Sequence, residues 1–103
     1  MSRLVKVAET KDVAPGTGIV VEAAGLSLAL FNVAGTFHAI DNTCPHAEGP
    51  LGEGALAGEV VTCPWHEAKF NVKTGDVLGP PASTGVRSFP VQVQGSDVLV
   101  QVD

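Results

Sequence analysis

Turn-forming residues divide the chain into short segments, and this feature most constrains how the chain can fold. There are 12 glycines and 7 prolines, and the segments between them are rich in valine, which occurs 16 times. Valine fits the half-buried surface of a β-sheet, whereas glycine and proline favour turns. No segment has the apolar period of a long helix. The sequence therefore predicts an all-β fold of short antiparallel strands in a small barrel or in stacked sheets.

The expected strands follow one another along the chain at spacings typical of hairpins. Ala24-Gly25 and Gly95-Ser96 are expected to be hairpin turns, and Lys73-Thr74-Gly75 another turn. One helical turn is expected near residues 11–12, and the four phenylalanines are expected in the core. The expected strands are 4–7, 18–23, 26–32, 36–40, 55–56, 59–62, 69–72, 76–78, 86–94 and 97–102.

Length and charge narrow the class of protein. A chain of 103 residues is expected to be one domain, because domains commonly contain about 100–150 residues. With 11 acidic and 6 basic side chains, the formal charge is −5. This charge argues against nucleic-acid binding and suits a partner with a basic patch. No segment resembles a membrane span or a signal peptide, so a cytoplasmic protein is expected.

Two irregular segments, 42–54 and 79–83, interrupt the strands, and functional residues concentrate on such loops. The first of them contains one of the chain's 2 cysteines. Two cysteines are too few for a disulfide framework. In the cytoplasm such a pair is more often a metal or redox site than a disulfide.

Each cysteine has a histidine close behind it. Cys44-Pro45-His46 has the pattern C-x-H, and Cys63-Pro64-Trp65-His66 has the pattern C-x-x-H, with 16 residues between His46 and Cys63. Each cysteine directly precedes a proline, which favours an extended backbone at the cysteine. If the two segments lie side by side, two thiolates and two imidazoles share one volume.

Two metal centres are compatible with this set of ligands. Two cysteines and two histidines can bind a tetrahedral zinc ion. They can also bind a [2Fe–2S] cluster in which two histidines replace two cysteines on one iron. Zinc fingers usually group their ligands as a cysteine pair and a histidine pair. Here each segment supplies one cysteine and one histidine, which suits a centre with two metal atoms.

The motif C-x-H, 16 residues, C-x-x-H resembles that of the Rieske proteins. The flanking residues 39–42 (Ala-Ile-Asp-Asn) and 70–75 (Phe-Asn-Val-Lys-Thr-Gly) strengthen the resemblance, which covers essentially the whole chain. The chain looks most like the stand-alone Rieske ferredoxins of bacterial aromatic-ring-hydroxylating dioxygenase systems.

This resemblance implies a fold, a cofactor and its ligands. The fold is a single Rieske domain, 1–103, of stacked antiparallel sheets, with a small cluster-binding subdomain over about 41–82. One [2Fe–2S] cluster is expected per chain. By resemblance, Cys44 and Cys63 bind the inner iron, and His46 and His66 bind the outer iron near the surface. The segment containing Pro80-Pro81 would cover the cluster from a third side.

The resemblance also bears on the reduction potential. High-potential Rieske proteins carry a disulfide between the two ligand loops, and this chain has no spare cysteine. They also place a serine and a tyrosine after the second histidine, where this chain has Ala68 and Phe70. Hydrogen bonds to the sulfurs raise the potential. Without them we expect a potential toward the low end of the Rieske range, roughly −150 mV.

The expected function is electron transfer in aromatic hydrocarbon catabolism, with no catalytic residues in the chain. The protein would carry single electrons, as a monomer, from an NAD(P)H-dependent ferredoxin reductase to a terminal Rieske oxygenase. No phosphate-binding fingerprint suggests a nicotinamide or flavin site. Two alternatives stay open: the small Rieske-like subunit of an NAD(P)H nitrite reductase, and a structural zinc domain.

Several residues near the motifs have roles that the sequence leaves open. Trp65 could shield the cluster, contact a partner or pack in the interior, and shielding is favoured by its position. Glu48, Glu53 and Glu67 could be solvated surface or docking residues. His38 lies in an expected strand outside both motifs and is interpreted as a sheet or surface residue.

Overall fold

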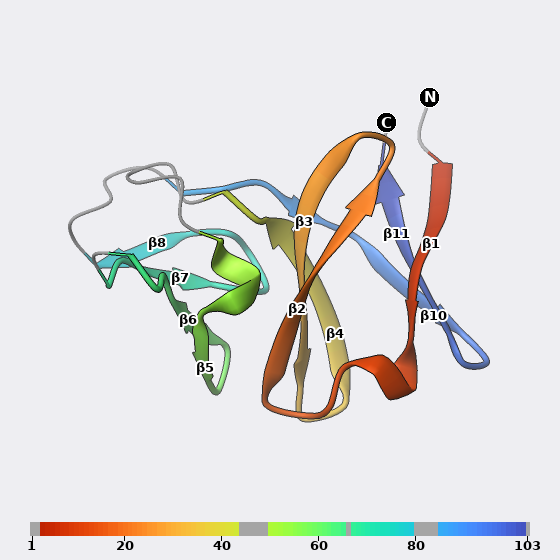
Figure 1. Cartoon of the computed structure of the whole chain (residues 1–103), viewed down its shortest axis with the longest axis horizontal. Coiled ribbons are helices and arrows are strands. Elements are labelled where there is room, and N and C mark those ends of the chain that lie inside the picture. The colour runs from red at the N-terminus through yellow and green to blue at the C-terminus, as the bar shows by residue number, and fades with distance from the viewer. Residues whose placement is uncertain (1–2, 44–49, 66, 80–84, 103) are drawn as a thin grey trace.

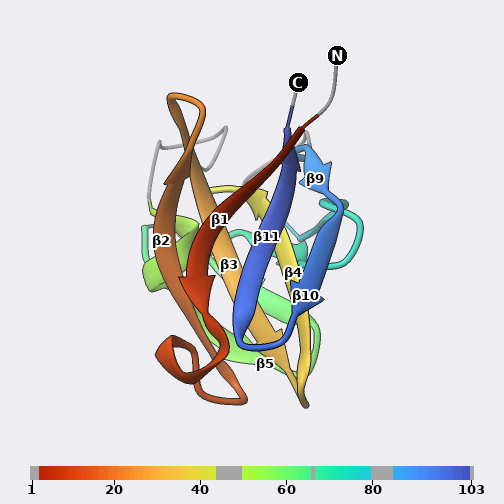
Figure 2. The same cartoon turned by 90° about the vertical axis from the view of Figure 1, so that its right-hand side faces the viewer.

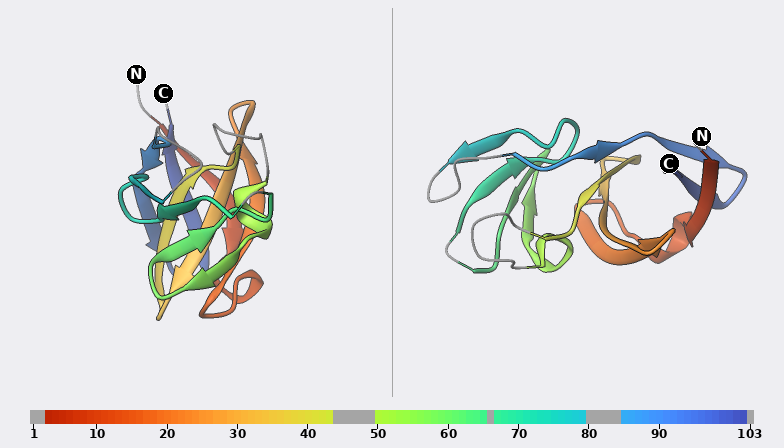
Figure 3. Two further views of the ribbon diagram at one scale, coloured as in Figure 1. Left: turned by 90° about the vertical axis from the view of Figure 1, so that its left-hand side faces the viewer. Right: turned by 90° about the horizontal axis from the view of Figure 1, so that it is seen from above.

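The computed structural model describes residues 3–43, 50–65, 67–79 and 85–102, which form three antiparallel sheets stacked along the long axis of the molecule (Figures 1 and 3). The prediction of an all-β fold of stacked antiparallel sheets is confirmed. The strands are β1 (Arg3–Glu9), β2 (Thr17–Ala23), β3 (Leu26–Val33), β4 (Thr36–Asp41), β5 (Ala55–Ala57), β6 (Val60–Thr62), β7 (Lys69–Asn71), β8 (Val77–Gly79), β9 (Ser88–Phe89), β10 (Val91–Gln94) and β11 (Asp97–Val102).

The central sheet, with strand order β2-β3-β4-β9, is covered on both faces (Figure 3). On one side lies the sheet β1-β11-β10, and on the other the sheet β5-β6-β7-β8. Residues 28–32 of β3 are all buried, because successive side chains point to opposite faces and both faces are covered. A strand covered on both sides carries an apolar run rather than an alternating pattern. The apolar run Leu28-Ala29-Leu30-Phe31 has this character.

Two apolar cores fill the spaces between the sheets, and they meet the central sheet from opposite sides. Phe31 and Phe70 are fully buried, and Phe37 and Phe89 are partly buried against the second core. The expected placement of the phenylalanines in the core is therefore confirmed. The first core comprises Ala29, Phe31, Ile40, Leu51, Val61, Cys63, Ala68, Phe70 and Val72. The second comprises Ala8, Val13, Val21, Ala23, Leu28, Leu30, Ala39, Val98, Val100 and Val102.

The prediction of one continuous strand over 86–94 is wrong, because this segment passes from one sheet to another at Pro90. Before the proline, β9 pairs with β4 of the central sheet. After it, β10 pairs with β11 of the outer sheet. Proline lacks the N–H that a continuous ladder requires, although its carbonyl accepts a hydrogen bond from the Gln101 N–H at 2.9 Å. Figure 2 shows β9 and β10 one after the other beside β11.

Two short 3₁₀ helices join the strands. Thr10–Asp12 forms the helical turn that the sequence predicts, and Asp12 accepts a hydrogen bond from the Glu9 N–H at 2.9 Å. Leu51–Glu53 is a second such helix, which the sequence analysis missed. Its Gly52 packs so closely on β2 that a Cβ there would lie 2.9 Å from the Ile19 carbonyl oxygen. Position 52 therefore requires a glycine, because a larger residue would collide with β2.

The sheet β5-β6-β7-β8 spans Ala55–Gly79 and lies at one end of the molecule (Figure 1). The predicted subdomain over 41–82 contains this sheet, but its boundaries stay a prediction. Among the described residues, no helix is long and apolar enough to cross a membrane.

Candidate metal centre

Cys63 lies directly after β6, with its side chain fully buried in the first core. Cys63 and Ala68 lie opposite each other, and the Cys63 N–H donates a hydrogen bond to the Ala68 carbonyl oxygen at 2.7 Å. Glu67 has a φ of 59°, in the left-handed region. The hydrogen bond fixes the position of Cys63 beside buried Ala68, at the start of the return into β7.

The residues on either side of the segment that contains the C-x-H motif lie close together. Thr43 and Pro50, which flank residues 44–49, form an antiparallel β-bridge. The Leu51 N–H donates to the Asn42 carbonyl oxygen at 2.7 Å, and the Leu51 side chain belongs to the same core as Cys63. Leu51, which follows the C-x-H motif, and Cys63, the cysteine of the C-x-x-H motif, therefore pack in the same core.

The chain leaves the sheet a third time after β8, into residues 80–84, which are called the third segment below. Thr62 pairs with Lys69, which in turn pairs with Gly79, the last residue of β8. The end of β6 next to Cys63 and the end of β8 therefore lie at the same end of the sheet's strands. Residues 44–49, 66 and 80–84 lie outside the described residues, so the predicted ligands Cys44, His46 and His66 and the Pro80-Pro81 segment remain predictions.

The chain returns from that third segment through a tightly packed crossing. Gly75, with a φ of 83°, follows β7 and accepts a hydrogen bond from the Val86 N–H at 2.8 Å. Both Gly75 and Gly85 lack the Cβ that would collide with backbone at this contact. The Arg87 side chain then donates to both carboxylate oxygens of Asp41, each at 3.3 Å. Asp41 ends β4 three residues before Cys44, so this ion pair connects the return of the third segment to the entrance of the first.

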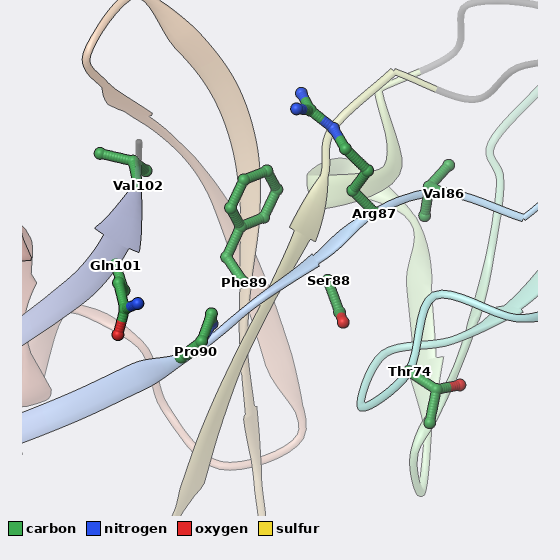
Figure 4. A pocket seen from close by; sticks show the side chains of 8 residues that line it. All are labelled: Thr74, Val86, Arg87, Ser88, Phe89, Pro90, Gln101 and Val102. Carbon is green, nitrogen blue, oxygen red and sulfur yellow. The ribbon is translucent and has the colours of Figure 1, made fainter. Parts of the chain in front are cut away.

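A cavity of about 390 Å³ lies along β9 and the residues on either side of it (Figure 4). Residues 86–90 line it together with Thr74, Gln101 and Val102. Arg87 is its charged side chain, and this guanidinium already binds Asp41 and lies 5.2 Å from the centre of the Phe89 ring. Among the described residues that line the cavity there is no cysteine, histidine or carboxylate.

The side chains around Cys63 suit a metal-bound thiolate. A sulfur ligand is soft and prefers iron–sulfur clusters, zinc or copper(I), and full burial at Cys63 excludes water from the sulfur. Ala68 and Phe70, also fully buried in the first core, offer no hydroxyl group to a sulfur. Within the described part of the chain, no three metal-ligating side chains come together. Cys63 is thus the one member of the predicted four that the structure places.

The structure describes most of the residues whose roles the sequence left open. Glu53 and Glu67 are exposed, and Trp65 keeps 52% of its surface exposed, which disfavours the interpretation that Trp65 packs in the interior. His38 is partly buried in β4, and its Nε2 has no hydrogen-bond partner among the described residues. Burial, followed by the nearby charge of Lys73, lowers the pKa of His38, which Glu59 raises to a lesser extent. Glu48 lies outside the described residues.

Sequence reasoning missed the residues that hold the motif in place, namely Asn42 and the pair Asp41–Arg87. Asn42 is buried, and its side chain bonds to Ser27 and Gly52. The signal available was a polar Asp-Asn pair at the end of an apolar strand, directly before the first motif. The partners Ser27 and Arg87 are distant in sequence, and no local pattern indicates them.

Comparisons with a family model, with related sequences and with solved structures all indicate the same family. Residues 3–90 match the family model described as Rieske [2Fe-2S] domain. The ferredoxin component of biphenyl 2,3-dioxygenase from Rhodococcus jostii (strain RHA1) is 40% identical over 100 residues, covering 97% of this chain and 94% of the relative. The ferredoxin of carbazole 1,9a-dioxygenase from Nocardioides aromaticivorans IC177 has a TM-score of 0.90 at 31% identity, covering 94% of this chain and 95% of that one.

Two further solved structures bear on partners and alternatives. A ferredoxin in a complex of reduced oxygenase and oxidised ferredoxin, from a carbazole 1,9a-dioxygenase, has a TM-score of 0.88 at 37% identity and covers 94% of this chain and 91% of its own. A structure from Mycobacterium tuberculosis described as an NADH-dependent nitrite reductase small subunit has a TM-score of 0.89 at 22% identity, covering 100% of this chain and 97% of its own. The second likeness concerns the fold alone.

Proposed function

The chain belongs to the Rieske [2Fe-2S] domain family, and from that premise we propose that it is a one-electron carrier of an aromatic-ring-hydroxylating dioxygenase system. The observation that carries the proposal is the pair of motifs C-x-H and C-x-x-H, with Cys63 fully buried where the second motif leaves β6. Relatives that match nearly the whole chain are ferredoxin components of biphenyl and p-cumate dioxygenase systems. The chain itself transforms no substrate.

The proposed ligands are Cys44 and Cys63 for the inner iron and His46 and His66 for the outer iron. A Rieske cluster, when bound, accepts and releases one electron at a time. The residues of this chain bind the cluster, and the first core around Cys63 keeps water from the thiolate side. The bridge Thr43–Pro50 and the hydrogen bond between Cys63 and Ala68 support the placing of both ligand segments at one end. The cluster-binding subdomain is proposed to span about 41–82.

The proposed partners are an NAD(P)H-dependent ferredoxin reductase and a terminal Rieske oxygenase, which a cytoplasmic monomer would contact in turn. The relative solved in complex with its oxygenase supports the second partner. Docking is proposed at the end of the molecule that carries the two histidines. Brief encounters between redox proteins use small interfaces, and exposed aromatic side chains often carry much of the binding energy.

Iron and sulfide analysis, combined with the EPR spectrum of the reduced protein, tests the proposal. The expected result is two irons and two acid-labile sulfides per chain, with a spectrum typical of nitrogen ligation. Replacing His46 or His66 by cysteine should change that spectrum and lower the potential. A colourless protein that contains zinc and no sulfide would establish the structural zinc domain. Tight association with a large haem subunit would establish the nitrite reductase alternative.

A hydroxyl group placed beside the proposed cluster should raise its potential. We expect a wild-type midpoint of roughly −150 mV, and in Ala68→Ser an upward shift of up to about 100 mV. A hydrogen bond to a charged group contributes about 1.5–3 kcal/mol, and 59 mV corresponds to a factor of ten in a one-electron equilibrium. Redox titration of wild type, Ala68→Ser and the control Ala57→Ser measures this shift.

Ala57 is exposed on β5 and Ala68 is fully buried in the first core. The control should therefore keep the wild-type midpoint. A wild-type midpoint well above zero would contradict the low-potential assignment. Equal midpoints in all three proteins would show that position 68 does not face the cluster sulfurs.

Removing the exposed indole at Trp65 should slow electron delivery to the oxygenase without changing the cluster. Trp65 is 52% exposed next to the proposed ligand His66, whereas Val93, the control, is 45% exposed on β10 of the outer sheet. We expect Trp65→Ala to lower the second-order rate of oxygenase reduction about tenfold, which corresponds to about 1.4 kcal/mol of docking energy. Val93→Ala should react at the wild-type rate.

Stopped-flow reduction of the oxygenase, together with the midpoint of each variant, checks this prediction. A slower rate accompanied by a shifted midpoint would favour the earlier interpretation that Trp65 shields the cluster. Unchanged rates in Trp65→Ala would exclude Trp65 from the docking surface.

A further inference from the structure

We propose that Asn42 is a positioning residue that fixes both ends of the first ligand segment, 44–49, and so determines the geometry of the cluster ligands on it. This inference rests on the proposed function, because Cys44 and His46 are ligands by that proposal. Asn42 precedes Cys44 by two residues and is 8% exposed. A buried amide whose oxygen and nitrogen both have hydrogen-bond partners holds the groups around it in one arrangement.

The side chain of Asn42 joins two separate parts of the fold. Its Oδ1 accepts a hydrogen bond from the Gly52 N–H at 2.8 Å, and its Nδ2 donates to the Ser27 Oγ at 3.2 Å. Ser27 lies in β3 of the central sheet, whereas Gly52 lies in the 3₁₀ helix that follows the ligand segment. The amide therefore fastens the exit of the segment to the central sheet.

The backbone of Asn42 also bonds to β3 and to the 3₁₀ helix that follows the ligand segment. Its N–H donates to the Ser27 carbonyl oxygen at 3.1 Å, and its carbonyl accepts from the Leu51 N–H at 2.7 Å. One residue further, Thr43 bridges to Pro50. Three of these five contacts, to Gly52, Leu51 and Pro50, hold the entrance and the exit of the segment together. The two contacts to Ser27 fasten the entrance to the central sheet.

The exit of the segment rests on a firm support. Gly52 is buried against β2, where a Cβ would lie 2.8 Å from Val20 Cγ2 and 2.9 Å from the Ile19 carbonyl oxygen. The Gly52 N–H faces Asn42 rather than solvent, so loss of the amide leaves a buried donor unpaired. The turn must then shift to reach another partner, and the segment attached to it shifts as well.

The chain offers a matched control at the other end of the central sheet. Asn32 is 4% exposed, donates its Nδ2 to the Val13 carbonyl oxygen at 2.8 Å and accepts the Gly35 N–H on Oδ1 at 2.7 Å. Both buried amides therefore accept a glycine N–H on Oδ1 and donate from Nδ2 to an oxygen, which is the Ser27 hydroxyl for Asn42 and a backbone carbonyl for Asn32. Asn32 serves the turn between β3 and β4, and it has no contact with residues 43 or 50–52 among these hydrogen bonds.

The experiment compares Asn42→Ala, Asn42→Asp, Ser27→Ala and Asn32→Ala with wild type, each as the cluster-loaded protein. The readouts are the EPR g-values and linewidths of the reduced form, the midpoint potential, the rate of iron loss to a chelator, and urea unfolding. Substitution of groups that orient metal ligands typically costs 10–100-fold in metal affinity. We expect Asn42→Ala to shift or broaden the EPR signal and to lose iron about 10–100-fold faster.

The other variants separate positioning from general stability. Asn32→Ala should lose unfolding free energy comparable to that lost by Asn42→Ala and keep the wild-type EPR signal and iron-loss rate. Asn42→Asp should restore most of the EPR line shape, because its carboxylate still accepts the Gly52 N–H and the Ser27 hydroxyl can turn to donate. Ser27→Ala removes one contact and should change the signal in the same direction by less, which keeps the test decisive if Asn42→Ala does not fold.

Two results would overturn the inference. Asn42→Ala, or Ser27→Ala if the former does not fold, could show wild-type EPR, potential and iron loss. Alternatively, Asn32→Ala could change these readouts as much as Asn42→Ala does. A wild-type protein without a Rieske EPR signal would overturn the proposed function and the inference together. A wild-type signal accompanied by an unchanged Asn42→Ala signal would overturn the inference alone.

Discussion

Replacing Cys63 by alanine is expected to abolish cluster binding and leave the fold of the chain in place. The side chain is fully buried in the first core, where alanine is accommodated because a buried cysteine behaves as a small apolar residue. The backbone hydrogen bond from the Cys63 N–H to the Ala68 carbonyl oxygen does not involve the sulfur and remains. By the proposed ligand assignment, the substitution removes one of the two thiolates, so no cluster is expected to form.

Iron and sulfide content and the reduced EPR spectrum measure the loss, and far-ultraviolet circular dichroism measures the fold. Val61→Ala is the matched control, since Val61 is fully buried in the same core two residues earlier on β6. Removing its methyl groups should cost about 2 kcal/mol of unfolding free energy and leave two irons per chain. If Cys63→Ala retained iron and the wild-type spectrum, Cys63 would not be a ligand.

The strand pattern was predictable because each strand is a local apolar segment that ends at a local turn. Ala24-Gly25 and Gly95-Ser96 form turns at the expected places, with φ values of 51° at Ala24, 81° at Gly25 and 63° at Gly95. The one wrong strand, 86–94, shows where local reasoning fails. Its valines and phenylalanine fit a sheet throughout, but Pro90 divides it between two sheets. Which strand pairs with which depends on contacts that no segment contains.

In the candidate site, too, local sequence patterns indicate some residues and not others. The motif that carries the proposed ligands is visible in the sequence, because a cysteine and a histidine lie within four residues in each segment. The residues that support it were not predictable, because their partners are remote in sequence. Arg87 reaches Asp41 across 46 positions, and Asn42 reaches Ser27 across 15. A close contact between two backbones, such as that of Gly75 with Val86, leaves a sequence signal no stronger than that of any turn glycine.

That contact leads to a second large expected effect, in which Gly75→Ala lowers the unfolding free energy by about 4 kcal/mol. A φ of 83° is strained for any residue with a Cβ. The new methyl group would also collide with the Val86 carbonyl oxygen, so the two segments must separate. Separation breaks the 2.8 Å hydrogen bond from the Val86 N–H to the Gly75 carbonyl oxygen. Because small domains are stable by only about 5–15 kcal/mol, this loss is a large fraction of the total.

Gly95→Ala is the matched control for this substitution. Gly95 also has a positive φ, 63°, but a Cβ there would meet no atom within 4 Å. The control therefore suffers only the backbone strain and should lose about 1 kcal/mol. Urea unfolding of the three proteins gives both values, provided that the dependence on urea concentration is the same for each. Equal losses in the two variants would mean that strain alone accounts for the effect of Gly75→Ala. A loss about 3 kcal/mol larger for Gly75→Ala would show that its contact with Val86 holds the return of the chain from the third segment.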